Sequence, residues 1–289
     1  MTIPTLPLPP LNQIVGLHRK AVKCPLLWTA EHLDWLGCRF DDFTTTAVLP
    51  DAALSDHANL SNKGKDSHAI KHHGIQKEVE RLAVSSSPEM KSFSIKKLLV
   101  GDKLPFRRSC AGPEFFYAGR PVHRPPYVIF YPRGRLYEPN NQGLPLTGYI
   151  HYSEIKRQRR KYNRRQNRSC SAPDYKFWDR LSRITPVKWS QDPYLFCILL
   201  SIAQRQSRSK RWHHQHLESP YRACLLVTNE SDCRFIYLFE LSVMSEHLKI
   251  FERPDLARTP TIWPTIKCIS IPFEPYFTFQ SRILAAFGD

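Results

Sequence analysis

Apolar and polar residues follow their clearest pattern in residues 190–289. Asp192 followed by Pro193 is typical of a helix start, because the aspartate can cap the helix and the proline suits its first turn. An apolar stretch continues this helix to about residue 206. Two further apolar runs, YRACLLVTN and CRFIYLFELS, are separated only by the polar residues ESD. This pattern indicates two strands joined by a short turn.

The remaining elements of the C-terminal region follow from shorter patterns. SEHLKIF predicts a short helix, IKCISIPF a strand and TFQSRILAAFG a terminal helix. Aromatic and β-branched runs between residues 110 and 137 also predict strands. Residues 106–289 are therefore expected to form an α+β domain, with helices packed on a small mixed or antiparallel sheet. Seven apolar residues are expected to be buried together in its core: Leu195, Ile198, Leu199, Ile202, Leu226, Ile236 and Leu238.

The first third of the chain carries weaker signals. Residues 1–43 predict a Pro-rich extended segment, followed by a short helix at 30–36 that ends at Gly37. Residues 44–105 are mostly polar and predict a disordered linker, with one amphipathic helix around 75–84. The N-terminal region as a whole is therefore expected to be Pro-rich and partly disordered.

Hydropathy and cysteine usage indicate the compartment. No apolar stretch reaches the roughly 18 residues that would span a bilayer, and the chain start lacks the basic and apolar regions of a signal peptide. The 8 cysteines include no C-x-x-C pair, which is typical of reduced thiols rather than a disulfide framework. These features predict an intracellular protein, in the nucleus or the cytoplasm, with no membrane partner.

Positive charge is concentrated in the middle of the chain. The formal net charge is +16, and residues 151–220 contain 16 Lys and Arg against 5 Asp and Glu, a net charge of +11. A field of this kind attracts polyanions whatever the fold. The densest run is KRQRRKYNRR, residues 156–165. The residues expected to form a nuclear address or to bind a polyanion are Lys156, Arg157, Arg159, Arg160, Lys161, Arg164, Arg165 and Arg168, and in a second cluster Arg208, Lys210, Arg211 and Trp212.

Three interpretations of the basic run stay open. An exposed run of Lys and Arg is enough for a nuclear address, which an import receptor would bind through residues 156–168. A basic helix over the same residues would instead contact nucleic acid phosphates, with Tyr152 and Tyr162 available for stacking. The run can also be a solvated connector. The second cluster has a simple structural explanation, because the C-terminal end of a helix favours cations.

The stretch FSIKKLLVG, residues 93–101, could bind a protein partner. Its apolar positions are typical of short amphipathic segments that dock into a groove of another protein. The same positions would also suit a helix that packs on the protein's own core. The residues in question are Phe93, Ile95, Leu98 and Leu99.

Enzyme chemistry has little support in the sequence. His68 and His72 have the spacing of a helical metal pair, but no further ligand is fixed nearby, so no metal and no cofactor are predicted. A degenerate nuclease-like enzyme is the alternative, although the lysine that should stand two residues after Glu240 is missing. The carboxylates of such a site would be Asp192, Glu230, Asp232 and Glu240.

Several segments over roughly residues 110–289 are distinctive, above all the W-x-x-D-P-Y helix start and the T-N-x-x-D turn. In these segments the chain resembles an uncharacterised family that is abundant in filamentous ascomycete fungi. The resemblance implies a fungal origin and a common fold, and it carries over no catalytic residue. We therefore expect a non-enzymatic binding protein with a basic nuclear-targeting or polyanion-binding segment. A structural or assembly role is a third possibility.

Overall fold

The computed structural model describes residues 24–45, 65–102, 104–133, 144–167, 174–212, 220–254 and 263–288. The Pro-rich start expected at residues 1–23 lies outside the described residues, and so does Arg168. Helices α4 and α8 also contain residues whose side chains are not described, among them Lys210, Arg211 and Trp212.

The described strands form one mixed seven-stranded sheet and one separate hairpin. In the sheet, β6 runs parallel to β7 and β1 runs parallel to β9, and the other neighbours are antiparallel. The hairpin consists of β3 (Phe115–Tyr117) and β4 (Arg120–His123). In order across the sheet, the strands are β1 (Thr44–Thr45), β9 (Lys267–Pro272), β8 (Asp232–Val243), β7 (Tyr221–Asn229), β6 (Leu146–His151), β5 (Val128–Pro132) and β2 (Phe106–Ala111).

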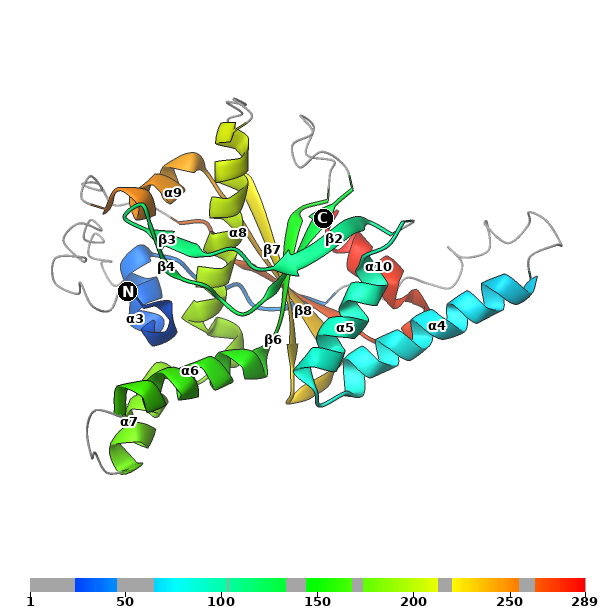
Figure 1. Ribbon diagram of the computed structural model, residues 1–289, viewed down its shortest axis with the longest axis horizontal. Coiled ribbons are helices and arrows are strands. Elements are labelled where there is room, and N and C mark those ends of the chain that lie inside the picture. Colours follow the sequence, from blue (N-terminus) through cyan, green and yellow to red (C-terminus); the bar gives the residue numbers. More distant parts are fainter. Residues whose placement is uncertain are drawn as a thin grey trace, which may run out of the picture.

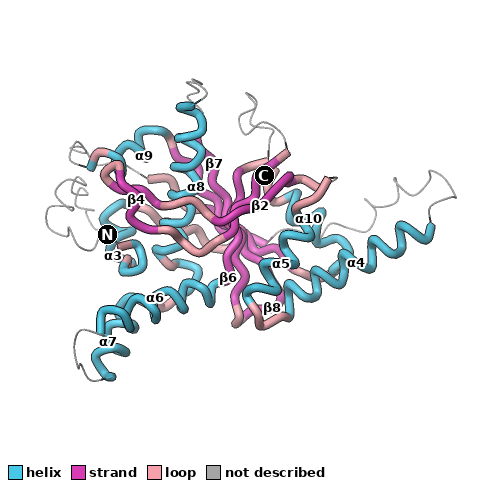
Figure 2. The backbone as a smooth tube through the Cα atoms, viewed as in Figure 1, coloured by secondary structure: helices cyan, strands magenta, loops and turns pink. Residues whose placement is uncertain are grey.

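Helices cover both faces of this sheet, which lies between them in Figure 1. One face carries α3 (Ala30–Leu36), α6 (Tyr152–Asn167), α8 (Pro193–Trp212) and α9 (Ser245–Glu252), with α7 (Asp174–Ile184) packed on α6. The other face carries α4 (Lys65–Val84), α5 (Pro88–Leu99) and α10 (Phe279–Ala285). Figure 2 shows the same division of helices and strands. The expected fold class, a mixed sheet with helices packed on it, is confirmed.

The parallel pair β6–β7 determines where α6 and α8 lie. Parallel neighbours cannot be joined by a tight turn, so the chain crosses over through α6, α7 and α8 before it enters β7. Helix α6 begins at Tyr152, directly after β6 ends at His151. A Cβ at Gly148 in β6 would lie 3.0 Å from Ile202 of α8, so glycine permits the close approach of helix and sheet.

The seven apolar residues expected in the core are all fully buried. However, they do not form one group. The four on α8 belong to the core on the α8 face, whereas Leu226, Ile236 and Leu238 belong to the core on the α5 face. The prediction of burial is confirmed and the prediction of a single cluster is wrong, because successive strand residues point to opposite faces of a sheet.

The N-terminal segment belongs to the domain. The helix at 30–36 is confirmed as α3, and Gly37 ends it in the left-handed conformation with φ 67°. Trp28 and Leu33 are part of the core on the α8 face. Thr44 and Thr45 then form the edge strand β1 beside β9. The expected boundary after residue 43 is therefore wrong.

The disordered linker expected over residues 44–105 is also wrong for the part that the structure describes after residue 74. Helices α4 and α5 form a hairpin that packs on the sheet, and α4 contains the helix expected at 75–84. The buried apolar residues of the hairpin are Val79, Leu82, Ala83, Ile95, Leu98 and Leu99. Some of the polar side chains of this hairpin form hydrogen bonds inside it. Ser94 donates a hydrogen bond of 2.8 Å to Glu78, and Lys91 donates to the backbone oxygens of Leu82 and Ala83.

Replacing Lys91 with alanine should lower the free energy of unfolding by about 1–3 kcal/mol, because the last carbonyls of α4 would lose their buried donor. Lys91 is only 3% exposed, and its ammonium lies 2.8 Å from the Ala83 oxygen. The exposed Lys77 on α4 is the matched control, and its replacement with alanine should change stability by less than about 0.5 kcal/mol. Urea denaturation of both variants measures the difference. If both variants lose equally little free energy of unfolding, Lys91 does not stabilise the hairpin of α4 and α5.

No disulfide forms among the seven cysteines of the described residues, and four of these are buried: Cys38, Cys197, Cys224 and Cys268. Among the described helices, none is both long and apolar enough to cross a membrane.

Candidate polyanion-binding site

The charged run forms helix α6, and the helix divides it into two faces. The inner face packs on the domain and contains Tyr152, Ile155, Arg159 and Asn163, which are all buried. This spacing of three and four residues places them on one side of a helix. The outer face, which we call the basic face, consists of the exposed residues Arg157, Arg160, Lys161, Arg164 and Arg165.

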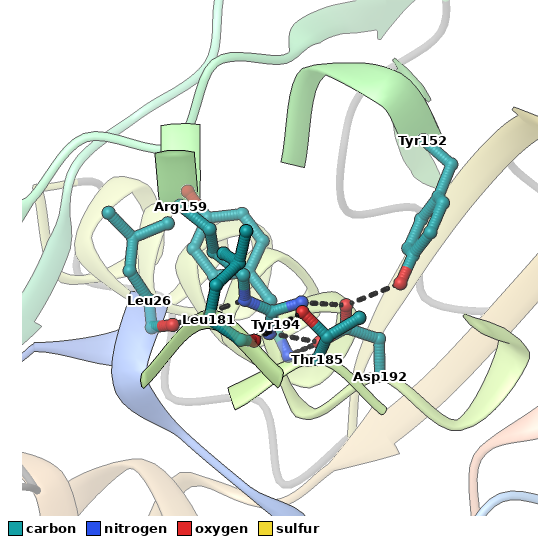
Figure 3. A network of polar contacts seen from close by, with 7 residues as sticks. All are labelled: Leu26, Tyr152, Arg159, Leu181, Thr185, Asp192 and Tyr194. Carbon is teal, nitrogen blue, oxygen red and sulfur yellow. Dashed lines mark hydrogen bonds and ion pairs between the residues drawn. The ribbon is translucent and has the colours of Figure 1, made fainter. Parts of the chain in front are cut away.

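Arg159 does not belong to the basic face, and its expected role in polyanion binding needs correction. It is 1% exposed, and its two terminal nitrogens donate to the Asp192 carboxylate at 2.6 and 2.7 Å (Figure 3). Its Nε donates to the Leu26 oxygen at 3.2 Å. Burial alone would lower the pKa of Arg159, but the Asp192 carboxylate outweighs this effect and raises it. The buried and permanently charged guanidinium therefore links α6 to the start of α8 through an ion pair.

Asp192 also explains the W-x-x-D-P-Y motif. Its Oδ1 accepts the backbone N–H of Tyr194 at 2.9 Å, which caps α8, and its Oδ2 accepts the Tyr152 hydroxyl at 2.9 Å (Figure 3). Trp189 lies in the short 3₁₀-helix η3 (Trp189–Gln191) just before this cap, and its ring centroid lies 5.4 Å from that of Tyr152. The motif that carries the resemblance is therefore structural in this chain.

The basic face forms one wall of an open groove of about 880 Å³. The opposite lining comes from the start of α5, at Pro88 and Glu89, and from Glu230 in the turn between β7 and β8. Lys156 at the edge of the groove bonds Glu230 at 2.5 Å, and this bond lowers the pKa of the Glu230 carboxyl. Arg157 likewise pairs with Glu154.

Four cations of the basic face have no such partner. Within the described residues, no carboxylate forms an ion pair with Arg160, Lys161, Arg164 or Arg165. All four line the groove, where Arg160 still acts electrostatically on the Glu230 carboxylate. An anionic ligand could pair with them without displacing a protein carboxylate.

The second basic cluster lies at the other end of α8. Arg208 is half-buried, and its guanidinium stacks over the Phe116 ring. Helix α8 has 20 residues and so is about 30 Å long. Asp192, which caps the start of α8, contacts α6, and the last turn of α8 lies at the other end of this helix, away from α6, in Figure 1. The two clusters therefore do not form one surface.

The four carboxylates of the nuclease-like alternative do not converge. Asp192 binds Arg159, Glu230 binds Lys156, and Glu240 binds Arg222 at 2.6 Å. Asp232 accepts the Tyr237 hydroxyl at 2.6 Å and lies eight residues from Glu240 along β8, a separation of about 26 Å. No group of three or more His, Cys, Asp or Glu in the described part of the chain could hold a metal ion.

The expected protein-binding segment is mostly internal. Ile95, Leu98 and Leu99 are buried against the sheet, so they are not accessible to a partner. Phe93 alone of the four is exposed, at 47%, and Lys97 lies 4.6 Å above its ring. The partner interface through these four residues is therefore wrong, and the segment packs on the protein's own core.

A pocket that the sequence did not indicate lies beside the groove. It has a volume of about 300 Å³ and lies between α5 and the ends of β5 and β6. His151 lines it and is only 3% exposed. Burial, and to a smaller extent the Lys91 ammonium, lowers the pKa of His151, so its imidazole is neutral at pH 7. The only feature of the sequence that could have indicated this pocket is the position of His151, between an apolar strand and a basic run. The basic run itself was the more conspicuous feature.

The geometry therefore singles out the basic face and the adjoining pocket as the candidate site. Comparisons of this chain with protein families, with curated proteins and with solved structures find no match.

Proposed function

We propose that this protein is a nucleic acid-binding protein whose basic face contacts the phosphate backbone. The observation that carries this proposal is a set of four cations, Arg160, Lys161, Arg164 and Arg165, which line an open groove and form no ion pair with a carboxylate of the described residues. Phosphate contacts of this kind supply affinity without reading the sequence.

The spacing of the basic face suits a phosphate backbone. Arg157 and Arg165 are separated by about 12 Å along the axis of α6. Phosphates follow one another at about 3.4 Å along the axis of each duplex strand, and single strands are more extended. The basic face can therefore contact about three phosphates of one strand.

The anchoring of α6 also favours a binding surface. The buried pair of Arg159 and Asp192 holds the helix in place, so a ligand need order only the long side chains of the basic face. Pre-organisation of this kind lowers the entropic cost of binding.

A nuclear address through residues 156–168 is the second candidate, and the exposure of the basic face supports it. A receptor that reads consecutive residues in an extended form would have to unfold α6 and break the pair of Arg159 with Asp192. That cost makes the folded surface the better supported function. A nuclease-like or assembly role has no separate observation in its favour.

A charge-removal experiment tests the proposal. Replacing Arg160, Lys161, Arg164 and Arg165 with glutamine should weaken binding to single-stranded and duplex oligonucleotides. It should also reduce the slope of log K against log salt by about 0.7–0.9 for each lost phosphate contact. The melting temperature should hardly change, since all four residues are exposed. Fluorescence anisotropy over a series of salt concentrations measures both quantities.

A matched control separates a local surface from net charge. It replaces four other exposed cations with glutamine: Arg107, Arg120, Lys249 and Lys267. This variant loses the same formal charge but should retain most of the affinity and the salt slope. If both variants lose affinity equally, only the overall field acts and the proposed surface is wrong. A fluorescent fusion of each variant tests the nuclear address. If the basic face is that address, the variant without it should leave the nucleus and the control variant should stay there.

A further inference from the structure

The groove beside α6 has sides of opposite charge. One side is the basic face, whereas Glu89 at the start of α5 and Glu230 in the turn between β7 and β8 line the other side. The two sides are close enough to interact, because Arg157 acts electrostatically on the Glu89 carboxylate and Arg160 acts on that of Glu230. A ligand in the groove therefore lies next to cations on one side and carboxylates on the other.

Glu89 is the carboxylate whose charge a polyanion would meet most directly. Within the described residues it forms no ion pair, whereas Glu230 is bonded to Lys156. The Ser87 hydroxyl donates a hydrogen bond of 2.9 Å to Glu89 Oε2, which holds the carboxylate near the first turn of α5. A hydrogen bond from its own backbone N–H and the bond from Ser87 lower the pKa of Glu89, so the carboxylate is ionised at pH 7.

A duplex and a single strand present different charges to such a groove. A duplex has a second row of phosphates across its minor groove, about 6 Å wide, and across its major groove, about 12 Å wide. With one row on the basic face, the second row would approach the Glu89 carboxylate. Like charges brought together in an interface oppose binding. A single strand has only one row of phosphates, so all of its bound phosphates can lie on the basic face.

We propose that the groove selects single-stranded over double-stranded nucleic acid, and that Glu89 is the residue that determines this selectivity. The inference rests on the proposed function and deepens it by naming the class of ligand. The basic face supplies the affinity, and Glu89 excludes a second strand. Glu230 has a smaller part, because Lys156 already neutralises its charge.

Fluorescence anisotropy tests the selectivity with a short DNA strand of mixed sequence, which is used alone or annealed to its complement. At physiological ionic strength the protein should bind the single strand about fivefold more tightly than the duplex. Glu89→Gln should raise the affinity for the duplex about fivefold and that for the single strand less than about twofold, because only the duplex brings a second row of phosphates to this side. Glu89→Lys should raise the duplex affinity further. Glu89 is exposed, so both replacements keep the fold.

A control variant and a salt series separate this effect from net charge and from structure. Glu80→Gln removes an exposed carboxylate on α4 outside the groove and should leave both affinities unchanged. The gain in duplex affinity of Glu89→Gln should shrink as the salt concentration rises, since salt screens the repulsion between exposed charges. A structural effect of the replacement would not depend on salt in this way.

The outcomes distinguish this inference from the proposed function. If the duplex binds as tightly as the single strand, or if Glu89→Gln strengthens both equally, the selectivity is wrong and the proposed function stands. An equal gain from Glu80→Gln would assign the effect to net charge and would also overturn the role of Glu89. If neither ligand binds, the proposed function is wrong and the selectivity is wrong with it.

Discussion

Replacing Asp192 with alanine should lower the free energy of unfolding by about 3–5 kcal/mol, because it leaves the buried Arg159 guanidinium without a counter-charge. Both side chains are at most 1% exposed, so water cannot replace the lost carboxylate. The same change removes the acceptor of the Tyr152 hydroxyl and the cap of α8 at Tyr194. Urea denaturation followed by circular dichroism measures the loss.

Two control variants isolate the buried charge. Arg160 follows Arg159 directly but lies on the basic face, so its replacement with methionine should change stability by less than about 0.5 kcal/mol. The double variant Arg159→Met with Asp192→Leu should be more stable than Asp192→Ala alone, because it leaves no unpaired charge in the interior. A loss below about 1 kcal/mol for Asp192→Ala would show that this pair does not anchor α6.

Replacing Leu199 with aspartate should abolish soluble folding. Leu199 is fully buried on α8, in the core on the α8 face of the sheet. An isolated carboxylate in such an apolar site costs more free energy than a domain of ordinary stability can lose. The soluble fraction on expression and the melting curve of any soluble protein measure the result.

Leu199→Met is the control for this position. It conserves side-chain volume and adds no polar atom, so it should cost less than about 1.5 kcal/mol and remain soluble. Wild-type melting of the aspartate variant would contradict the position of α8 in the core. Poor solubility of both variants would indicate sensitivity to shape at this site rather than to the buried charge.

Local patterns were sufficient for the main helices and strands of residues 190–289. The Asp192-Pro193 signal correctly predicts the start of α8, and the ESD residues correctly predict the turn between β7 and β8. Helix α8 runs to Trp212 rather than to about residue 206, because its polar last turns still continue the backbone hydrogen bonds. Caps, turns and apolar periodicity depend on residues a few positions apart, so the sequence contains them directly.

Such local patterns could not predict the adjoining pocket. His151, Thr228 and Glu89 belong to segments that are far apart in the chain, and only the parallel pairing of β6 with β7 and the docking of α5 bring them together. Thr228 opens the T-N-x-x-D turn, but no short spacing connects it with His151 or Glu89. The pocket therefore depends on contacts between distant residues, which only the fold creates.

The sequence by itself determined the main helices and strands of residues 190–289, the fold class and the excess of positive charge at residues 156–165. Only the tertiary structure decided the strand order, the docking of α4 and α5, and the different roles of Arg159 and Arg160. These two arginines are chemically identical neighbours in the sequence. Arg159 is structural because α8 brings Asp192, 33 positions later, within 2.6 Å of it, whereas Arg160 faces the groove. Burial and pairing depend on residues distant in the chain, and local propensity contains no information about them.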